Sequence, residues 1–169
     1  MPTRENEIRK AIENLDGDTF EKFSRILVRW EKFPGLRPTS QSHDKGEDSY
    51  TEATSIFLHD GKYVSLGASK IDELSKIKED CDKRIGQNID IWVFVTCGLV
   101  RRDRGKVWKD EVKKDYGWEL EVYDIEWLTD TSLHPKYESL VDDYLHIPLQ
   151  METILKKLQL NLQNVHNYL

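Results

Sequence analysis

The chain has 169 residues, of which 38% are hydrophobic and 33% charged, and a net charge of −6. This balance suits one domain with a sizeable core and excludes a disordered chain. No apolar run approaches the ~20 residues of a membrane span, and the opening residues are too charged for a signal peptide, so we expect a cytoplasmic protein without membrane contact. Cys81 and Cys97 fall in apolar patterns and are interpreted as reduced packing residues.

Two helices open the chain. Apolar residues at helical spacing predict a short amphipathic helix that ends at Asp16-Gly17. Asp18 is predicted to be the N-cap of the second helix, with Glu21 as its reciprocal capping partner. This helix ends at Pro34-Gly35, and its core-facing side chains are Phe20, Phe23, Ile26, Leu27 and Trp30.

A hairpin is expected next, after a polar segment rich in turn-forming residues. Residues 48–58 are rich in Thr, Ser, Tyr and Ile and predict a strand. Asp60-Gly61 is a strong hairpin-turn signal, so residues 62–69 are predicted to form the returning strand.

Helices and strands alternate in the second half. A helix is predicted over residues 71–85, and the nearly all-apolar run 89–97 predicts a central strand buried on both faces. A basic helix follows, with Val107, Trp108 and Val112 facing inward, and Gly117 ends it before a strand over residues 118–123. This order predicts an α/β domain with a mixed sheet flanked by helices.

The C-terminal part has a different pattern. We expect residues 1–133 to form the domain, and residues 134–169 to form a linker and an amphipathic helix. Apolar residues recur there at alternating spacings of four and three, as in a short heptad seam: Met151, Leu155, Leu158, Leu162, Val165 and Leu169. Two interpretations remain open: the helix packs on the domain's own core, or it mediates self-association or leads into a further domain.

Several segments resemble Mrr-like restriction-endonuclease domains of the PD-(D/E)XK nuclease superfamily. These are DTFEKF at 18–23, GED at 46–48, IWVFVTC at 91–97 with the basic helix after it, and GWELEVYDIEWLTD at 117–130. The resemblance covers about residues 16–130. It implies a restriction-endonuclease-like α/β fold, here with an extra C-terminal helix. It also implies a DNA endonuclease that uses Mg²⁺ or Mn²⁺, as the N-terminal effector domain of a bacterial restriction or anti-phage defence protein.

In that superfamily an Asp begins one strand, and a Glu or Gln two residues before a Lys lies on the next. Phosphodiester hydrolysis needs hard oxygen ligands for the metal ion, and a lysine can stabilise charge beside it. Asp48 matches the first position. If the second pair falls on Leu66 and Ala68, both groups are missing; if it falls on Ala68 and Lys70, only the carboxylate is missing. Strand periodicity places Glu52 on the face of Asp48, so Asp48 and Glu52 are the predicted metal ligands and Lys70 their catalytic partner.

Basic residues offer candidate DNA contacts. Residues 101–114 carry seven basic and three acidic residues, and a solvated helix face explains them equally well. As a DNA interface this helix would bind phosphates through Arg101, Arg102, Arg104, Lys106 and Lys109. A second basic group could bind the DNA backbone or simply lie on the solvated surface: Lys76, Lys78, Lys83 and Arg84.

Other candidates are weaker. Glu21 could reach the metal from its helix, although the capping role is preferred, and His43 and Asp44 lie in the loop before Asp48. The literal motif Asp60-Gly61-Lys62 is explained by a hairpin turn alone.

Two other functions remain open. The missing carboxylate favours a catalytically degenerate nuclease fold that binds DNA or a partner protein. The heptad seam favours an interaction module in which the terminal helix dimerises.

Overall fold

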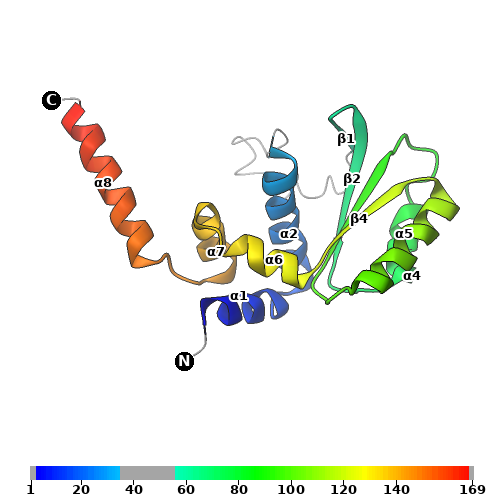
Figure 1. Ribbon diagram of the computed structural model, residues 1–169, viewed down its shortest axis with the longest axis horizontal. Coiled ribbons are helices and arrows are strands. Elements are labelled where there is room, and N and C mark those ends of the chain that lie inside the picture. Colours follow the sequence, from blue (N-terminus) through cyan, green and yellow to red (C-terminus); the bar gives the residue numbers. More distant parts are fainter. Residues whose placement is uncertain (1–2, 35–55, 168–169) are drawn as a thin grey trace.

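One sheet with helices on both faces forms the body of the protein, and a terminal helix extends from it (Figure 1). The structure is a computed structural model that describes residues 3–34 and 56–167, apart from the side chains of residues 152, 153 and 157. The strands are β1 (Ile56–His59), β2 (Lys62–Ser69), β3 (Ile91–Thr96) and β4 (Glu119–Tyr123). The helices are α1 (Arg4–Glu13), α2 (Gly17–Lys32), α4 (Leu74–Asp82), α5 (Arg102–Tyr116), α6 (Ile125–Ser132), the 3-10 helix η4 (Pro135–Tyr137), α7 (Glu138–Leu145) and α8 (Met151–Asn167).

The sheet is mixed, with the strand order β1-β2-β3-β4. β1 and β2 are antiparallel and joined by Asp60 and Gly61, whose positive φ angles of 49° and 76° suit a tight hairpin. β2, β3 and β4 are parallel, because helices α4 and α5 return the chain between them. The hairpin and the α/β sheet flanked by helices, both predicted from the sequence, are confirmed.

Each face of the sheet has its own apolar core. α1, α2, α6 and α7 cover one face, on which β2 places Val64, Leu66 and Ala68. α4 and α5 cover the other face, on which β3 places Trp92 and Phe94. Helices α2 and α4 therefore lie on opposite faces of the sheet, a position that determines the site described below.

The predicted start of α2 is wrong. The N-cap is Asp16, whose carboxylate accepts hydrogen bonds from the Thr19 amide at 2.8 Å and from its hydroxyl at 2.9 Å. These bonds lower the pKa of Asp16. Asp16-Gly17 was predicted to break the first helix, but Asp16 is the N-cap of α2 and Gly17 is its first residue. Asp18 lies inside the helix. Glu21 is therefore not a capping residue.

The predicted inward direction of Val107 is also wrong, since its side chain is 56% exposed. The prediction is confirmed for Trp108 and Val112, which face the sheet together with Gly105. Successive residues of a helix point about 100° apart, so Val107 points to the surface while Trp108 points to the core.

The core continues beyond the predicted boundary at residue 133. α6, η4 and α7 were not predicted, yet the segment after residue 133 contributes four buried side chains to the core that covers α2: Tyr137, Leu140, Val141 and Leu145. α6 and α7 have eight residues each, too few for a clear helical period.

α8 is the predicted amphipathic C-terminal helix, but it does not pack on the domain's core. The described side chains of its apolar seam are exposed, from 52% at Leu155 to 70% at Leu162. None of the helices that the structure describes is long and apolar enough to cross a membrane.

Candidate functional site

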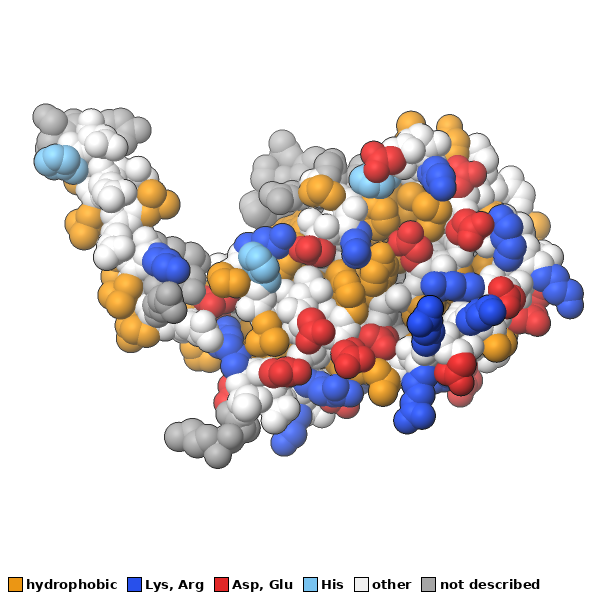
Figure 2. All heavy atoms as spheres, in the orientation of Figure 1, with side chains coloured by type: hydrophobic (Ala, Val, Ile, Leu, Met, Phe, Trp, Pro, Cys, Tyr) orange, Lys and Arg blue, Asp and Glu red, His pale blue; other side chains and the backbone are white. Residues whose placement is uncertain are grey.

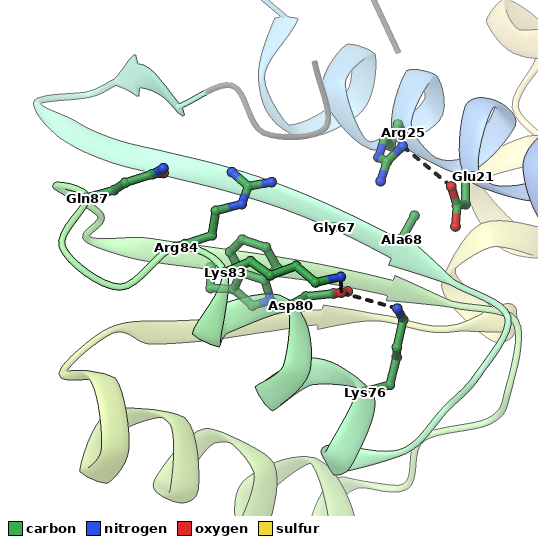
Figure 3. A pocket seen from close by; sticks show the side chains of 10 residues that line it. Glu21, Arg25, Gly67, Ala68, Lys76, Asp80, Lys83, Arg84 and Gln87 are labelled. Atoms are coloured by element: carbon green, nitrogen blue, oxygen red, sulfur yellow. Dashed lines mark hydrogen bonds and ion pairs between the residues drawn. The ribbon is translucent and has the colours of Figure 1, made fainter. Parts of the chain in front are cut away.

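The strongest candidate site is a pocket at the β2 edge of the sheet. Within the described residues, β1 pairs with β2 only as far as Ser65. Beyond that point Gly67 and Ala68 line a cavity of about 260 Å³. Figure 3 shows side chains from α2 and from the α4 segment approaching this edge from the two faces of the sheet.

The pocket is lined by four basic and two acidic side chains, and it therefore carries a net positive charge. Glu21 and Arg25 come from α2. Lys76 and Asp80 come from α4, and Lys83 and Arg84 from the turn after it. Gln87 and Trp92 complete the lining. A cavity with excess positive charge attracts anions, and its low-dielectric walls strengthen the attraction.

Both carboxylates of the pocket are ion-paired. The Asp80 Oδ1 atom lies 3.2 Å from the Lys76 Nζ atom and 3.9 Å from the Lys83 Nζ atom. The Glu21 Oε2 atom lies 3.8 Å from the Arg25 Nη1 atom (Figure 3). The side chains of Lys76 and Asp80 are only 24% and 19% exposed, so this pair is partly shielded from water.

The charges from the two helices influence one another. Burial raises the pKa of Glu21; Arg25 and Lys76 oppose this rise, while the Asp80 carboxylate adds to it. Burial also lowers the pKa of Arg25. The two carboxylates therefore act within one electrostatic site, although α2 and α4 cover opposite faces of the sheet.

Arg84 and Trp92 lie at the base of the site. Arg84 is 6% exposed, donates a hydrogen bond to the Ser65 hydroxyl at 3.2 Å, and places its guanidinium 5.5 Å from the centre of the Trp92 ring. Gly67 leaves room for that ring, because a Cβ atom there would lie 2.8 Å from Trp92 Cζ2. In the described part of the chain, the buried Nε of Arg25 and Nε1 of Trp92 lack hydrogen-bond partners. Arg25 and Trp92 line the pocket, and each carries one buried N–H group with no acceptor among the described residues.

The predicted catalytic residues have different outcomes. Asp48 and Glu52 lie outside the described residues. The ammonium of Lys70 donates to the carbonyls of Glu13 at 2.9 Å and Leu15 at 2.7 Å, at the C-terminal end of α1. These contacts give Lys70 a structural role, and its catalytic role stays a prediction.

The predicted DNA-binding residues of α5 and its N-cap lie elsewhere. All five are exposed, and Figure 2 shows Lys and Arg side chains gathered over this part of the molecule. Arg101, Arg102 and Lys109 line a second cavity of about 180 Å³, beside the end of β4. Arg104 instead pairs with Asp72 at 3.3 Å. Because β4 lies two strands from β2, the structure does not bring these residues into the first pocket.

The pocket offers donors suited to a hard divalent cation. Glu21 and Asp80 supply carboxylate oxygens, which Mg²⁺ and Mn²⁺ prefer. No group of three or more Asp, Glu, His or Cys side chains is placed to hold a metal ion among the residues that the structure describes. The two carboxylates have the oxygen chemistry that such an ion prefers, but each is already paired with basic side chains.

One of the pocket's residues, Asp80, could have been found from helical spacing. Lys76, Asp80 and Lys83 are separated by four and three residues and so share one face of α4. The basic group predicted from the sequence combined Lys76 and Lys83 with Lys78, which lies off this face, and did not include Asp80. Glu21 was assigned to a cap that α2 does not use.

Comparison with known proteins found no counterpart: no protein-family model, curated protein or solved structure matches the chain. Function is therefore inferred from the pocket itself.

Proposed function

We propose that this chain is a metal-dependent DNA endonuclease with a restriction-endonuclease-like fold, and that the pocket at the β2 edge holds the scissile phosphate. The observation that supports this most strongly is that Glu21, Lys76 and Asp80 line one pocket. The pocket lies on the strand where the resemblance to Mrr-like domains expects the second half of the motif.

The basic side chains bind the phosphate group. Arg25, which is partly buried, and Arg84, which is buried, flank the cavity, and Lys83 lies more exposed at its rim. Guanidinium groups match phosphate oxygens in a bidentate geometry, whereas an ammonium acts as a compact point charge. Arg25 and Arg84 would therefore orient the phosphate, and the lysines would neutralise its charge.

Lys76 takes the role that the sequence analysis gave to Lys70. Its ammonium faces the pocket and is held by Asp80 at 3.2 Å. A positioned cation of low exposure stabilises the negative charge that develops on a phosphoryl group during hydrolysis. Lys70, by contrast, donates to the end of α1.

Glu21 and Asp80 would hold the divalent ion, together with Asp48 and Glu52 if these residues act as predicted. When bound, Mg²⁺ or Mn²⁺ supplies Lewis-acid polarisation of the phosphate and lowers the pKa of a coordinated water. The chain's own part is to place two carboxylates beside the phosphate-binding cations. The proposed setting is a bacterial restriction or anti-phage defence protein of the cytoplasm, with this chain as its N-terminal effector domain.

A second candidate is DNA binding without cleavage. It is favoured by the pairing of both carboxylates with basic side chains, which leaves the described lining of the pocket with excess positive charge and no unpaired acid. Such a pocket binds phosphate without help from a metal.

Asp80→Asn separates the two candidates. The protein is incubated with supercoiled plasmid in Mg²⁺ or Mn²⁺, with EDTA as control, and binding to a labelled duplex is measured by fluorescence anisotropy. A nuclease loses cleavage in this variant, yet binds DNA more tightly, since Lys76 and Lys83 are released from Asp80. Duplex binding by the wild type without cleavage in either metal refutes the nuclease proposal and supports the second candidate. Absence of both binding and cleavage refutes both.

A further inference from the structure

The helix α8 presents an apolar face that the other described residues leave uncovered. It extends away from the sheet and the helices that pack on it (Figure 1), and hydrophobic side chains lie along it (Figure 2). The exposed fractions of its apolar seam lie between 52% and 70%, at Met151, Leu155, Leu158, Leu162 and Val165. Single exposed apolar residues are normal on a protein surface, but a continuous stripe over four turns marks an interaction site.

The spacing of the seam is that of a coiled coil. Intervals of four, three, four and three place Leu155 and Leu162 at position a, and Met151, Leu158 and Val165 at position d, of a heptad. A helix of 17 residues is barely longer than the length at which isolated helices become marginal in water. A partner along the seam would stabilise it.

The residues beside the seam favour an identical partner. In coiled coils, charges at positions e and g select the partner, and like charges there repel. Within α8 only Glu152, at position e, places an Asp, Glu, Lys or Arg at these positions, and Lys156 and Lys157 fall at the outer positions b and c. No g position of the helix is charged. Two parallel copies can therefore pair without like charges facing each other, because position e of one helix faces position g of the other.

We propose that α8 associates along this seam with α8 of a second copy of the chain. This inference is independent of the proposed nuclease function, because no α8 residue lines the pocket at the β2 edge. Of the interpretations of this helix that the sequence left open, the proposal favours self-association over packing on the domain's own core or a lead into a further domain.

Leu158→Glu tests the proposal against a matched control, Leu160→Glu, on the full chain. The two leucines belong to the same helix, and their exposed fractions are 53% and 57%. Leu158 lies in the seam at d, whereas Leu160 lies at f on the opposite side. Sedimentation equilibrium over a wide concentration range should show a dimer for the wild type. Leu158→Glu should raise its dissociation constant by about a hundredfold or more, because an unpaired charge enters the interface. Leu160→Glu should leave the dissociation constant within about threefold.

A double variant with Leu158→Ala and Leu162→Ala excludes helix melting as the cause. Alanine is the best helix former, so α8 keeps its intrinsic propensity while the seam loses most of its apolar surface. We expect this variant to dissociate at least about tenfold more readily than the wild type. A wild-type chain that is monomeric at all concentrations overturns the proposal. So does a dimer that survives Leu158→Glu, or one that Leu160→Glu weakens equally.

Discussion

Replacement of Gly67 by alanine tests the packing at the base of the pocket. The new Cβ atom would lie 2.8 Å from Cζ2 and 3.4 Å from Cη2 of Trp92. The Trp92 side chain is 1% exposed, stacks against Trp118 at 6.4 Å between ring centroids, and lies beneath Arg84, so it cannot move aside freely. Overpacking of this kind costs about 1–3 kcal/mol. The smaller entropy of the unfolded alanine chain returns about 0.4–1 kcal/mol. The steric cost is larger, so we expect a net loss of about 1–2 kcal/mol in the free energy of unfolding.

A double-mutant cycle attributes the loss to Trp92. Urea unfolding is measured for the wild type, Gly67→Ala, Trp92→Phe and the double variant. Phenylalanine lacks the fused ring system that carries Cζ2 and Cη2, so the alanine should cost about 1 kcal/mol less in the Trp92→Phe background. An equal cost in both backgrounds, or a stabilising effect of Gly67→Ala, would contradict the packing described here.

Three further predictions concern the pocket and its neighbours. Lys70→Met should reduce the free energy of unfolding by about 1–2 kcal/mol, because two hydrogen bonds to the end of α1 are lost. DNA cleavage should be retained. A variant that is folded in a thermal assay but inactive in a cleavage assay would instead support the catalytic role of Lys70. Because burial raises the pKa of Glu21, the folded state binds that proton more tightly than the unfolded state. The stability of the wild type relative to Glu21→Gln should therefore fall as pH rises above the ordinary glutamate pKa of about 4.3, and denaturant titrations that show a rise would contradict this. Lys83→Met should lower the slope of log binding constant against log salt concentration by about 1, and an unchanged slope in anisotropy titrations would remove Lys83 from the DNA contacts.

Helices and strands with a long apolar pattern or a local turn signal could be predicted from the sequence. Short helices, and those whose exact start matters, could not. The apolar run of β3 and the Asp60-Gly61 turn are local signals, and the strand and the turn predicted from them are confirmed. α6 and α7 are too short to show a period, and their buried residues form a core only with α1 and α2. The start of α2 was missed because an Asp-Gly pair is compatible with both a helix break and a helix cap.

The pocket could not be assembled from the sequence because its members come from distant segments. Glu21 and Asp80 lie on helices that cover opposite faces of the sheet, and they share one site only because both helices reach the edge of β2. The strand itself carries no charged group there, only Gly67 and Ala68. A carboxylate was expected on β2 itself, whereas the carboxylates of the pocket lie on the helices beside that strand. Lys70 was favoured by its position at the end of the strand, where its amine instead meets the end of α1.

The rate of DNA cleavage by Lys76→Met, compared with Lys78→Met, tests the central claim most directly. Both lysines belong to α4, with side chains 24% and 29% exposed, but Lys76 faces the pocket while Lys78 pairs with Glu111 and Asp115 of α5. If Lys76 stabilises charge on the scissile phosphate, its loss should lower the cleavage rate in Mg²⁺ or Mn²⁺ by about 10²–10³-fold. The Lys78 variant, which removes only partly exposed ion pairs, should stay within about threefold of the wild type. Equal rates in the two variants would show that the pocket at the β2 edge is not where the phosphodiester is hydrolysed.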